Sequence, residues 1–245
     1  MMQWQQRDAL WLLAPAQAKG VIQFIGGSGL GATPQLSYRR LLEAMAQRGW
    51  LVQCWSYLPG FDHQLLAVQA WRGFRSQRQE QLPVLRLGHS MGCKLHLLAP
   101  DQGRGAQAEV LLSFNNFAAD RSIPLLGELA PRLGVTTEFS PGPDETLRII
   151  NSQLPQRPRL LIRFRDDQLD QSRQLLRFLP GGEAFNELQQ LGGDHLTPAS
   201  AGLRQQWLGG LGDGPRQREL NRLAEAIEQW WQQRGGIRSA AAAAN

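Results

Sequence analysis

The hydrophobic positions of this chain fall into two kinds of segment that alternate along most of its length. Short apolar runs predict buried β-strands, and the longer amphipathic segments between them predict helices. Such alternation is typical of an α/β fold in which a mostly parallel central sheet carries helices on both faces. We expect strands at 9–14, 21–25, 51–55, 82–87, 110–114, 160–164 and 185–190, and helices at 34–48, 63–80, 91–99, 124–133, 144–154 and 216–233.

One segment, 115–159, interrupts the alternation. It contains two amphipathic stretches joined by a linker rich in proline and glycine, Ser140-Pro141-Gly142-Pro143. This pattern predicts either a small helical lid inserted over a site or ordinary helices packed on the sheet, and it favours neither. We expect residues 1–238 to form a single domain around this insertion, and the alanine-rich residues 239–245 to form a disordered tail.

Length and composition fit this interpretation. A chain of 245 residues with 42% hydrophobic residues can bury the core of one domain. No apolar stretch approaches the roughly 20 residues that a membrane-spanning helix needs. The apolar run at 9–14 is short and follows Asp8, so we interpret it as a first strand and not as a signal peptide.

Charge and cysteine content narrow the expected partners and compartment. The net charge is +5, but the arginines are scattered and do not form a run with interleaved aromatic residues. This distribution predicts a solvated surface and no nucleic-acid partner. Cys54 and Cys93 lie in apolar surroundings, which predicts two buried thiols, a reducing compartment and therefore a cytoplasmic protein.

The most informative motif is Gly88-His89-Ser90-Met91-Gly92, which reads G-x-S-x-G. An apolar run precedes it and a helix-compatible run follows it, as a nucleophile elbow requires. In that turn a serine is held above the sheet with its hydroxyl exposed, and glycines leave room where the backbone is crowded. Ser90 is therefore the candidate nucleophile.

A serine hydroxyl becomes a good nucleophile only when a base accepts its proton. His89 is too close in sequence to Ser90 to act as that base, His96 lies on the helix behind the turn, and His63 begins a helix far from any acid-bearing strand. His195 follows the last predicted strand in a glycine-rich loop. By elimination, His195 is the candidate base.

The base in turn needs an acid, and the chain offers acids after the 160–164 strand, in the expected order of serine, acid and histidine. Asp167 is our first choice, and Asp166 and Asp170 remain alternatives. Asp194 is an immediate neighbour of His195, so we interpret it as a loop or capping residue.

Two backbone N–H groups would have to stabilise the oxyanion. One is expected from Met91, directly after the nucleophile. The other is expected from the glycine-rich loop 25–31, with Gly27 as the first candidate and Ser28 as the second.

The same loop also matches a dinucleotide-binding pattern, Gly27-x-Gly29-x-x-Ala32. That reading requires an acidic residue about 20 positions later, at the end of the next strand. The segment 53–57 contains no acid and no arginine, and the chain has no His/Cys spacing typical of a metal site. We therefore expect no cofactor and no metal.

Taken together, these motifs resemble the α/β-hydrolase superfamily. Three stretches also resemble an uncharacterised family from cyanobacteria and plant plastids, domain of unknown function family 1350, and Cys93-Lys94-Leu95-His96 is their most specific element. The resemblance implies an α/β-hydrolase fold and an oxygenic phototroph. The chain departs from the superfamily at Ile25-Gly26, where the oxyanion loop usually has His-Gly. The three stretches are 88–96, 164–167 and 192–198.

The sequence thus predicts a serine hydrolase that cleaves a small-molecule ester or thioester through an acyl-enzyme. Ser90 would attack, His195 would transfer the proton, and Asp167 would orient His195. An acyltransferase would share this site and differ only in the acceptor. The alternative is a catalytically silent scaffold of the same fold that binds a small ligand or a partner protein, since fold alone does not decide function.

Overall fold

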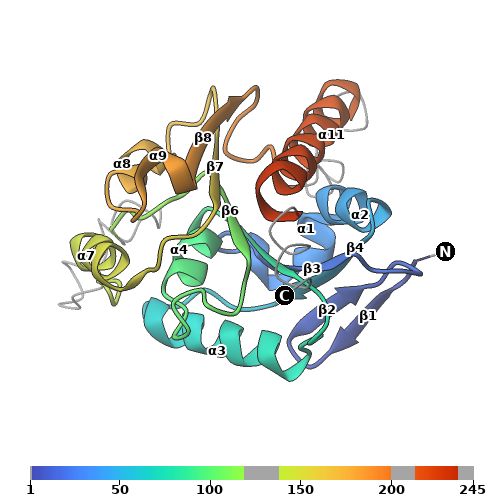
Figure 1. Cartoon of the computed structure of the whole chain (residues 1–245), viewed down its shortest axis with the longest axis horizontal. Coiled ribbons are helices and arrows are strands. Elements are labelled where there is room, and N and C mark those ends of the chain that lie inside the picture. The colour runs from blue at the N-terminus through green and yellow to red at the C-terminus, as the bar shows by residue number, and fades with distance from the viewer. Residues whose placement is uncertain (1, 119–137, 200–212, 237–245) are drawn as a thin grey trace, which may run out of the picture.

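The computed structural model describes residues 2–118, 138–199 and 213–236, and these contain one eight-stranded sheet (Figure 1). The strand order is β1-β2-β4-β3-β5-β6-β7-β8. The strands are β1 (Trp4–Arg7), β2 (Leu10–Leu13), β3 (Gly20–Ile25), β4 (Trp50–Trp55), β5 (Val84–His89), β6 (Ala108–Leu112), β7 (Arg159–Phe164) and β8 (Asn186–Leu191).

The pairing is parallel from β4 through β3, β5, β6 and β7 to β8. Only β2 runs the other way, antiparallel both to β4 and to the edge strand β1. The carboxyl ends of the six parallel strands therefore meet at one edge, which is where open α/β sheets carry their sites. The loops after β3, β5, β7 and β8 contain all the predicted site residues.

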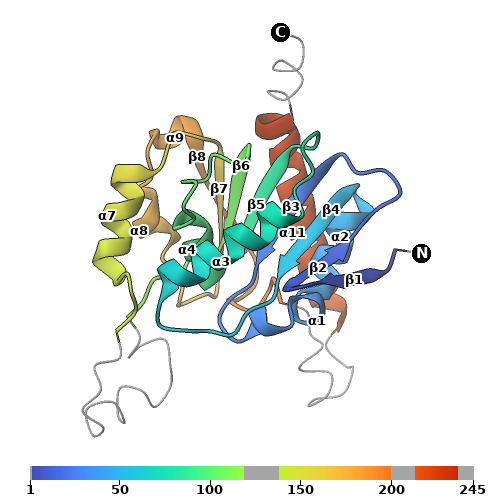
Figure 2. The same ribbon diagram turned by 90° about the horizontal axis from the view of Figure 1, so that it is seen from below.

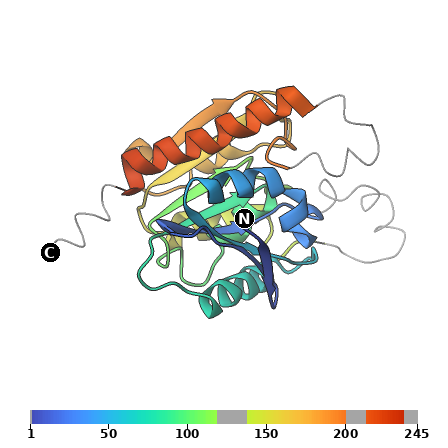
Figure 3. The same ribbon diagram turned by 90° about the vertical axis from the view of Figure 1, so that its right-hand side faces the viewer.

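Helices cover both faces of the sheet, so the molecule has three layers. Figure 2 shows α3, α4 and α7 in front of the sheet and α11 behind it, and Figure 3 shows α11 lying alongside α2. One face carries α1 (Pro34–Ser37), α2 (Arg39–Gln47) and α11 (Asp213–Trp230), and the other carries α3 (His63–Ser76), α4 (Met91–Leu97), α7 (Pro143–Gln153) and α8 (Ser172–Leu176). The short elements are η1 (Leu30–Ala32), α9 (Gly182–Phe185) and the π-helical turn η2 (Trp231–Gly236).

The sheet has a hydrophobic core on each face. The core under α2 and α11 is the larger one and is anchored by Trp50 at the start of β4. Trp50 is fully buried and packs edge to face on Trp231, with ring centroids 5.0 Å apart. Its indole N–H donates to the Glu228 carboxylate at 2.8 Å, and Lys19 also binds that carboxylate. The terminal helix is therefore fixed to the sheet by apolar packing and by a partly buried polar contact.

The predicted helix 34–48 is interrupted at Tyr38, which has non-helical dihedrals (φ −119°, ψ 16°) and separates α1 from α2. The Tyr38 ring is fully buried and packs edge to face on Phe24, with ring centroids 4.7 Å apart. Tertiary packing of this ring therefore overrides the helical pattern at this position.

The segment 115–159, for which a lid and an ordinary packed helix were both open, contains a helix that covers the sheet. Leu147 and Ile150 of α7 are buried and share a core cluster with Leu161 of β7. In the described residues, α7 is thus the crossover helix between β6 and β7. The other expected helix of the insertion, 124–133, and the expected tail, 239–245, lie outside the described residues.

The remaining differences concern short elements. The strand β1 was not predicted because its sequence Trp4-Gln5-Gln6-Arg7 is polar, and its side chains are mostly exposed. Its position comes from backbone pairing with β2 in a hairpin, which hydrophobic periodicity does not report. In the described part of the chain, no helix is both long and apolar enough to cross a membrane.

Candidate active site

Ser90 lies at the sharp turn between β5 and α4, with φ 54° and ψ −121°. A positive φ is costly for a residue other than glycine and persists only where the surroundings enforce it. Here they do. A Cβ at Gly88 would lie 2.7 Å from the Cα of Cys93, and one at Gly92 would lie 2.1 Å from the carbonyl oxygen of Ile25. Both glycines of the motif are therefore required by backbone packing.

The structure brings Ser90, His195 and Asp167 into one hydrogen-bonded series. His195 Nε2 lies 3.1 Å from Ser90 Oγ, and His195 Nδ1 lies 2.9 Å from Asp167 Oδ2. Since a carboxylate only accepts, Nδ1 carries the proton and Nε2 is free to accept the hydroxyl proton of Ser90. This is the arrangement that activates a serine in unrelated hydrolases.

Asp167 is held as a carboxylate. Its side chain is buried, which by itself would raise its pKa, but hydrogen bonds from His195 and from the Leu169 N–H outweigh burial and lower the pKa. The Leu169 N–H donates to Oδ1 at 2.8 Å, so both carboxylate oxygens are engaged. A charged, oriented acid of this kind stabilises the imidazolium that forms when His195 accepts a proton.

The alternative acids Asp166 and Asp170, and the loop residue Asp194, have other contacts. Asp166 is exposed, and its backbone N–H donates to Gly193 at 2.9 Å. Asp170 accepts from the Ser172 hydroxyl at 2.6 Å. Asp194 accepts from the Leu196 N–H at 3.0 Å, as expected for a loop residue.

The expected oxyanion loop lies beside Ser90. Gly27 lies against the nucleophile, since a Cβ at Gly27 would be 3.1 Å from the Cβ of Ser90. Its N–H, however, donates to the Tyr38 hydroxyl at 2.9 Å and is therefore engaged elsewhere. Ser28, our second choice, lies next to Gly27 and lines the same pocket. Met91 is the first residue of α4, so its N–H has no acceptor within the helix.

The Tyr38 hydroxyl begins a chain of hydrogen bonds that ends on the candidate base. Tyr38 Oη lies 2.8 Å from His89 Nδ1, and His89 Nε2 lies 2.9 Å from the His195 carbonyl oxygen. Because a carbonyl only accepts, His89 Nε2 donates and Nδ1 accepts from Tyr38. Burial, assisted by His195, lowers the pKa of His89 to about 3, which keeps this ring neutral.

Sequence reasoning excluded His89 as the base and did not predict this connecting role. The contact depends on Tyr38, which is far from His89 in the chain and was expected to be an ordinary helical residue. The signal in the sequence was only the position of His89 at the end of a strand beside Ser90.

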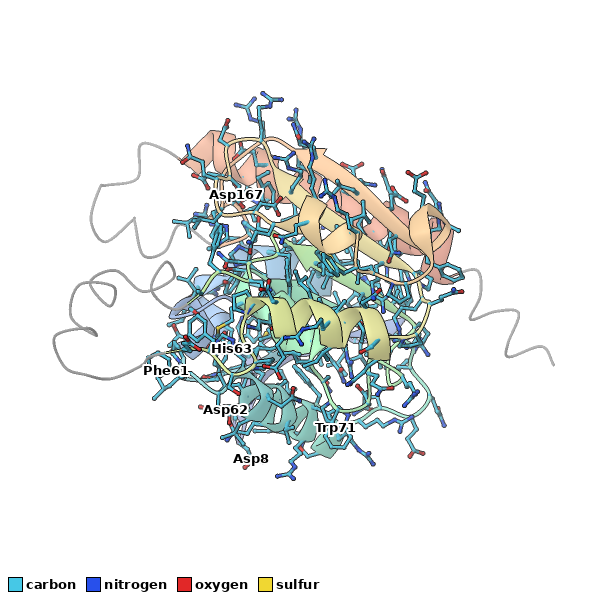
Figure 4. The ribbon with its side chains drawn as sticks, turned by 90° about the vertical axis from the view of Figure 1, so that its left-hand side faces the viewer. Asp8, Phe61, Asp62, His63, Trp71 and Asp167 are labelled. Carbon is cyan, nitrogen blue, oxygen red and sulfur yellow. The ribbon has the colours of Figure 1, made fainter. Side chains whose placement is uncertain are left out.

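A pocket of about 270 Å³ lies in front of Ser90. Two polar residues in its wall, His63 and Lys94, were not predicted to belong to the site. His63 begins α3, and Figure 4 shows it at the same end of the molecule as Asp167. We expected His63 to be far from the acid-bearing strand, but it shares a pocket with Ser90 because β4 and β5, the strands that precede them, flank β3 and end at the same edge of the sheet. The other lining residues are Gly27, Ser28, Leu30, His89, Met91, Asn115, Asn116, Phe117, Phe139, Leu169, His195 and Leu196.

Within the described ranges, no three His, Cys, Asp or Glu side chains gather as metal ligands would. Cys54 and Cys93 are buried and unpaired, in core clusters on opposite faces of the sheet. Their burial was predicted from their apolar neighbours.

Comparison with known proteins identifies both a family and a fold. The sequence profile of a family described as "Protein of unknown function (DUF1350)" matches residues 3–234. No protein with a curated description is found to be similar to this chain in sequence.

Several solved structures are similar across nearly the whole chain. Dienelactone hydrolase from Anabaena variabilis is 18% identical with a TM-score of 0.59, and covers 95% of this chain and 98% of its own. The esterase domain of a Rhodothermus marinus protein is 16% identical with a TM-score of 0.59, and covers 96% and 98%. A thioesterase domain from the curacin biosynthetic pathway is 14% identical with a TM-score of 0.54, and covers 83% and 96%. Such likeness shows the α/β-hydrolase fold.

Proposed function

The chain belongs to the DUF1350 family, and from that premise we propose that it is a serine hydrolase that cleaves an ester or thioester of a small molecule through an acyl-enzyme. The observation that carries the proposal is the series of contacts from Ser90 through His195 to Asp167. The likeness to esterases and a thioesterase supports a hydrolase scaffold, while the assignment of roles rests on the site itself.

In the proposed reaction, Ser90 Oγ attacks the carbonyl carbon of the substrate while its proton passes to His195 Nε2. The tetrahedral intermediate then expels the alkoxide or thiolate, which takes that proton from His195, and the acyl group remains on Ser90. A water molecule gives a proton to His195 and attacks the acyl-enzyme, which releases the acid and restores Ser90. Asp167 stabilises the His195 imidazolium in both halves of the reaction.

The negative oxygen of the intermediate needs hydrogen-bond donors at the place where the charge develops. We assign these donors to the backbone N–H groups of Met91 and Ser28. Gly27 serves this role only if its N–H leaves the Tyr38 hydroxyl. If the acceptor is an alcohol or amine in place of water, the same residues perform an acyl transfer.

The first test is labelling with a fluorophosphonate, which reacts with activated serines. Folded wild-type protein should be labelled, and Ser90→Ala and His195→Ala should both lose labelling. Ser76→Ala is the matched control, because the Ser76 hydroxyl is exposed and bonds only to the Gly73 carbonyl of its own helix. Panels of acyl esters and acyl thioesters would then identify the class of scissile bond.

The alternative, a catalytically silent scaffold that binds a small ligand or partner protein, is favoured by one observation, the engagement of the Gly27 N–H by Tyr38. Circular dichroism would confirm folding of the protein used for labelling. Absence of labelling in folded wild-type protein would contradict the hydrolase proposal and leave the scaffold as the function.

We also propose a reducing compartment, the cytoplasm, as the location of the protein. Two buried, unpaired thiols support this proposal, because disulfides are rare in that compartment. The setting in an oxygenic phototroph, which the resemblance implies, stays a prediction.

A further inference from the structure

Lys94 is a buried cation in the wall of the candidate active site. It lies on α4 one turn after Ser90, it is 1% exposed, and it lines the same pocket. Its Nζ donates to the Pro141 carbonyl at 2.9 Å and lies 5.8 Å from the centre of the Phe139 ring. No described residue forms an ion pair with Lys94. An ammonium has three donors, and among the described residues only the Pro141 carbonyl accepts from it, which leaves two N–H groups for a ligand.

The environment of Lys94 disfavours its charge without removing it. Burial lowers its pKa to about 8, and the carboxylate of Glu145, on the exposed side of α7, acts in the opposite direction. The ammonium is therefore still mostly protonated at pH 7. A buried charge without a partner is costly, and an anion bound in the pocket would compensate that cost.

His63 provides a second, independent polar group in the same wall. Its side chain is 2% exposed, and neither ring nitrogen has a hydrogen-bond partner among the described residues. The ring stacks on Phe139, with centroids 4.2 Å apart. Burial and the charge of Lys94 lower the pKa of His63 to about 3, so the ring is neutral and offers one N–H donor. Buried polar atoms are seldom left unpaired, which points to a ligand atom at this place.

The positions of Lys94 and His63 indicate which half of a substrate they face. His195 reaches Ser90 from the loop after β8, and it must lie beside the leaving group in order to protonate it. His63 begins α3, which follows β4, and β4 lies on the opposite side of β5 from β8; Lys94 belongs to α4, which follows β5 directly. The acyl group, which extends away from the leaving group, is therefore the half that they face.

We propose that the pocket selects an acyl group that ends in a carboxylate, and that Lys94 and His63 bind this carboxylate while Ser90 attacks the ester or thioester at the other end. The inference rests on the proposed function, since it names the substrate class of the same site. One ammonium and one neutral N–H donor match a single negative charge, whereas a phosphate would bring more charge than this wall neutralises. The pocket of about 270 Å³ fits a short acyl chain.

A binding experiment tests this inference without catalysis. Glutarate is titrated calorimetrically into the Ser90→Ala protein, with its neutral diamide, glutaramide, as the reference ligand. We expect glutarate to bind more tightly than glutaramide, and Lys94→Met to weaken glutarate about tenfold or more, the size expected for a charged hydrogen bond. His63→Phe keeps the stacking on Phe139 and should weaken glutarate by a smaller factor.

The matched control is Thr146→Val. The Thr146 hydroxyl bonds to the Pro141 carbonyl at 3.4 Å and to the Gly142 carbonyl at 2.7 Å, so this variant disturbs the same loop without removing a charge. Glutarate binding should survive Thr146→Val. If Thr146→Val and Lys94→Met weaken binding equally, Lys94 only anchors the Pro141 loop and the inference is overturned.

A kinetic experiment uses two aryl esters of equal size, a glutarate half-ester and the corresponding glutaramate ester. Wild-type protein should prefer the half-ester in kcat/KM by tenfold or more, and Lys94→Met should reduce that ratio to near one. The ratio is unaffected by a general loss of folding or of Ser90 reactivity. Preference for the neutral ester, or for a charged leaving group, would contradict the proposal.

The two proposals fail in distinguishable ways. If Ser90 is labelled but the protein does not bind glutarate, the hydrolase proposal stands and the proposed carboxylate specificity is wrong. If Ser90 is not labelled but the protein binds glutarate and this binding depends on Lys94, the hydrolase proposal is wrong and the pocket is a carboxylate-binding site.

Discussion

At the scale of single residues, the chain of hydrogen bonds from Gly27 through Tyr38 and His89 to His195 joins the oxyanion loop to the candidate base. The direction of each hydrogen bond is fixed: the Gly27 N–H donates to the Tyr38 hydroxyl, which donates to His89 Nδ1, and His89 Nε2 donates to the His195 carbonyl. The chain fixes the backbone of His195, while Asp167 fixes its ring. Two independent contacts thus hold the base over Ser90.

This series of hydrogen bonds predicts unequal effects for two similar substitutions. Tyr38→Phe removes a buried hydroxyl that joins Gly27 to His89, whereas Tyr57→Phe removes a buried hydroxyl that donates only to the Gly26 carbonyl, at 2.8 Å. Each should lower the free energy of unfolding by about 1–3 kcal/mol. Tyr38→Phe should in addition slow fluorophosphonate labelling of Ser90 by about tenfold or more, because a small displacement of a catalytic group is costly.

The measurement pairs denaturant unfolding with the rate of labelling in both variants. Equal labelling rates at equal stability would show that the chain of hydrogen bonds does not position His195.

Site residues differ in how far the sequence could predict them. Ser90, Asp167 and His195 follow strands in a known order, so local pattern was sufficient to bring them together, although their catalytic roles stay a prediction. Gly27 as an oxyanion donor stays a prediction, and nothing in the sequence indicated that the hydroxyl of Tyr38 accepts its N–H. Lys94 and His63 meet only through tertiary packing around Phe139, which periodicity does not report.

At the scale of elements, α11 completes one face of the sheet. Leu223 and Ile227 are fully buried in the cluster that contains Trp50, and Glu225, on the same helix, is exposed. The predicted helix 216–233 and the observed α11 share this apolar face, because a period of 3.6 residues was clear in the sequence. By contrast, the interruption at Tyr38 and the polar strand β1 depend on contacts outside their own segments.

Burial of this face predicts the effect of shortening one side chain in α11. Ile227→Ala should lower the free energy of unfolding by about 2–5 kcal/mol, since it removes buried methyl groups and leaves a cavity. Glu225→Ala is the control on the exposed side of the helix and should change the free energy of unfolding by less than about 0.5 kcal/mol. Urea denaturation monitored by tryptophan fluorescence measures the free energy of unfolding of both variants. An equal loss of stability in the two variants would contradict the packing of α11 on the sheet.

At the scale of the whole molecule, three histidines are buried, two of them in the wall of the pocket and one on α4. His63, His89 and His96 each have a pKa lowered to about 3, with burial as the main cause, so all three are neutral in the folded protein. In the unfolded chain they would titrate near 6.5. Between these values the unfolded state binds more protons than the folded state, and stability therefore falls as the pH falls.

The protein should thus lose stability on acidification from about pH 6.5, before its carboxylates are protonated. His96→Gln removes one of the three groups and keeps a donor for the Leu87 carbonyl, to which His96 Nε2 is bonded at 3.3 Å. This variant should reduce the slope of unfolding free energy against pH between 6 and 4.5 by about one third. Denaturant titrations at a series of pH values measure the slope, and an unchanged slope would show that His96 is not neutral in the folded state.

The packing of α11 also has a consequence for synthesis on the ribosome. The surface that Leu223 and Ile227 cover is built from β3, β4 and α2, which are made long before α11. Until the last part of the chain emerges, Trp50 and its apolar neighbours have no cover, and exposed apolar surface of this kind favours aggregation. We therefore expect the nascent protein to be prone to aggregation until α11 has been made and packs on this surface.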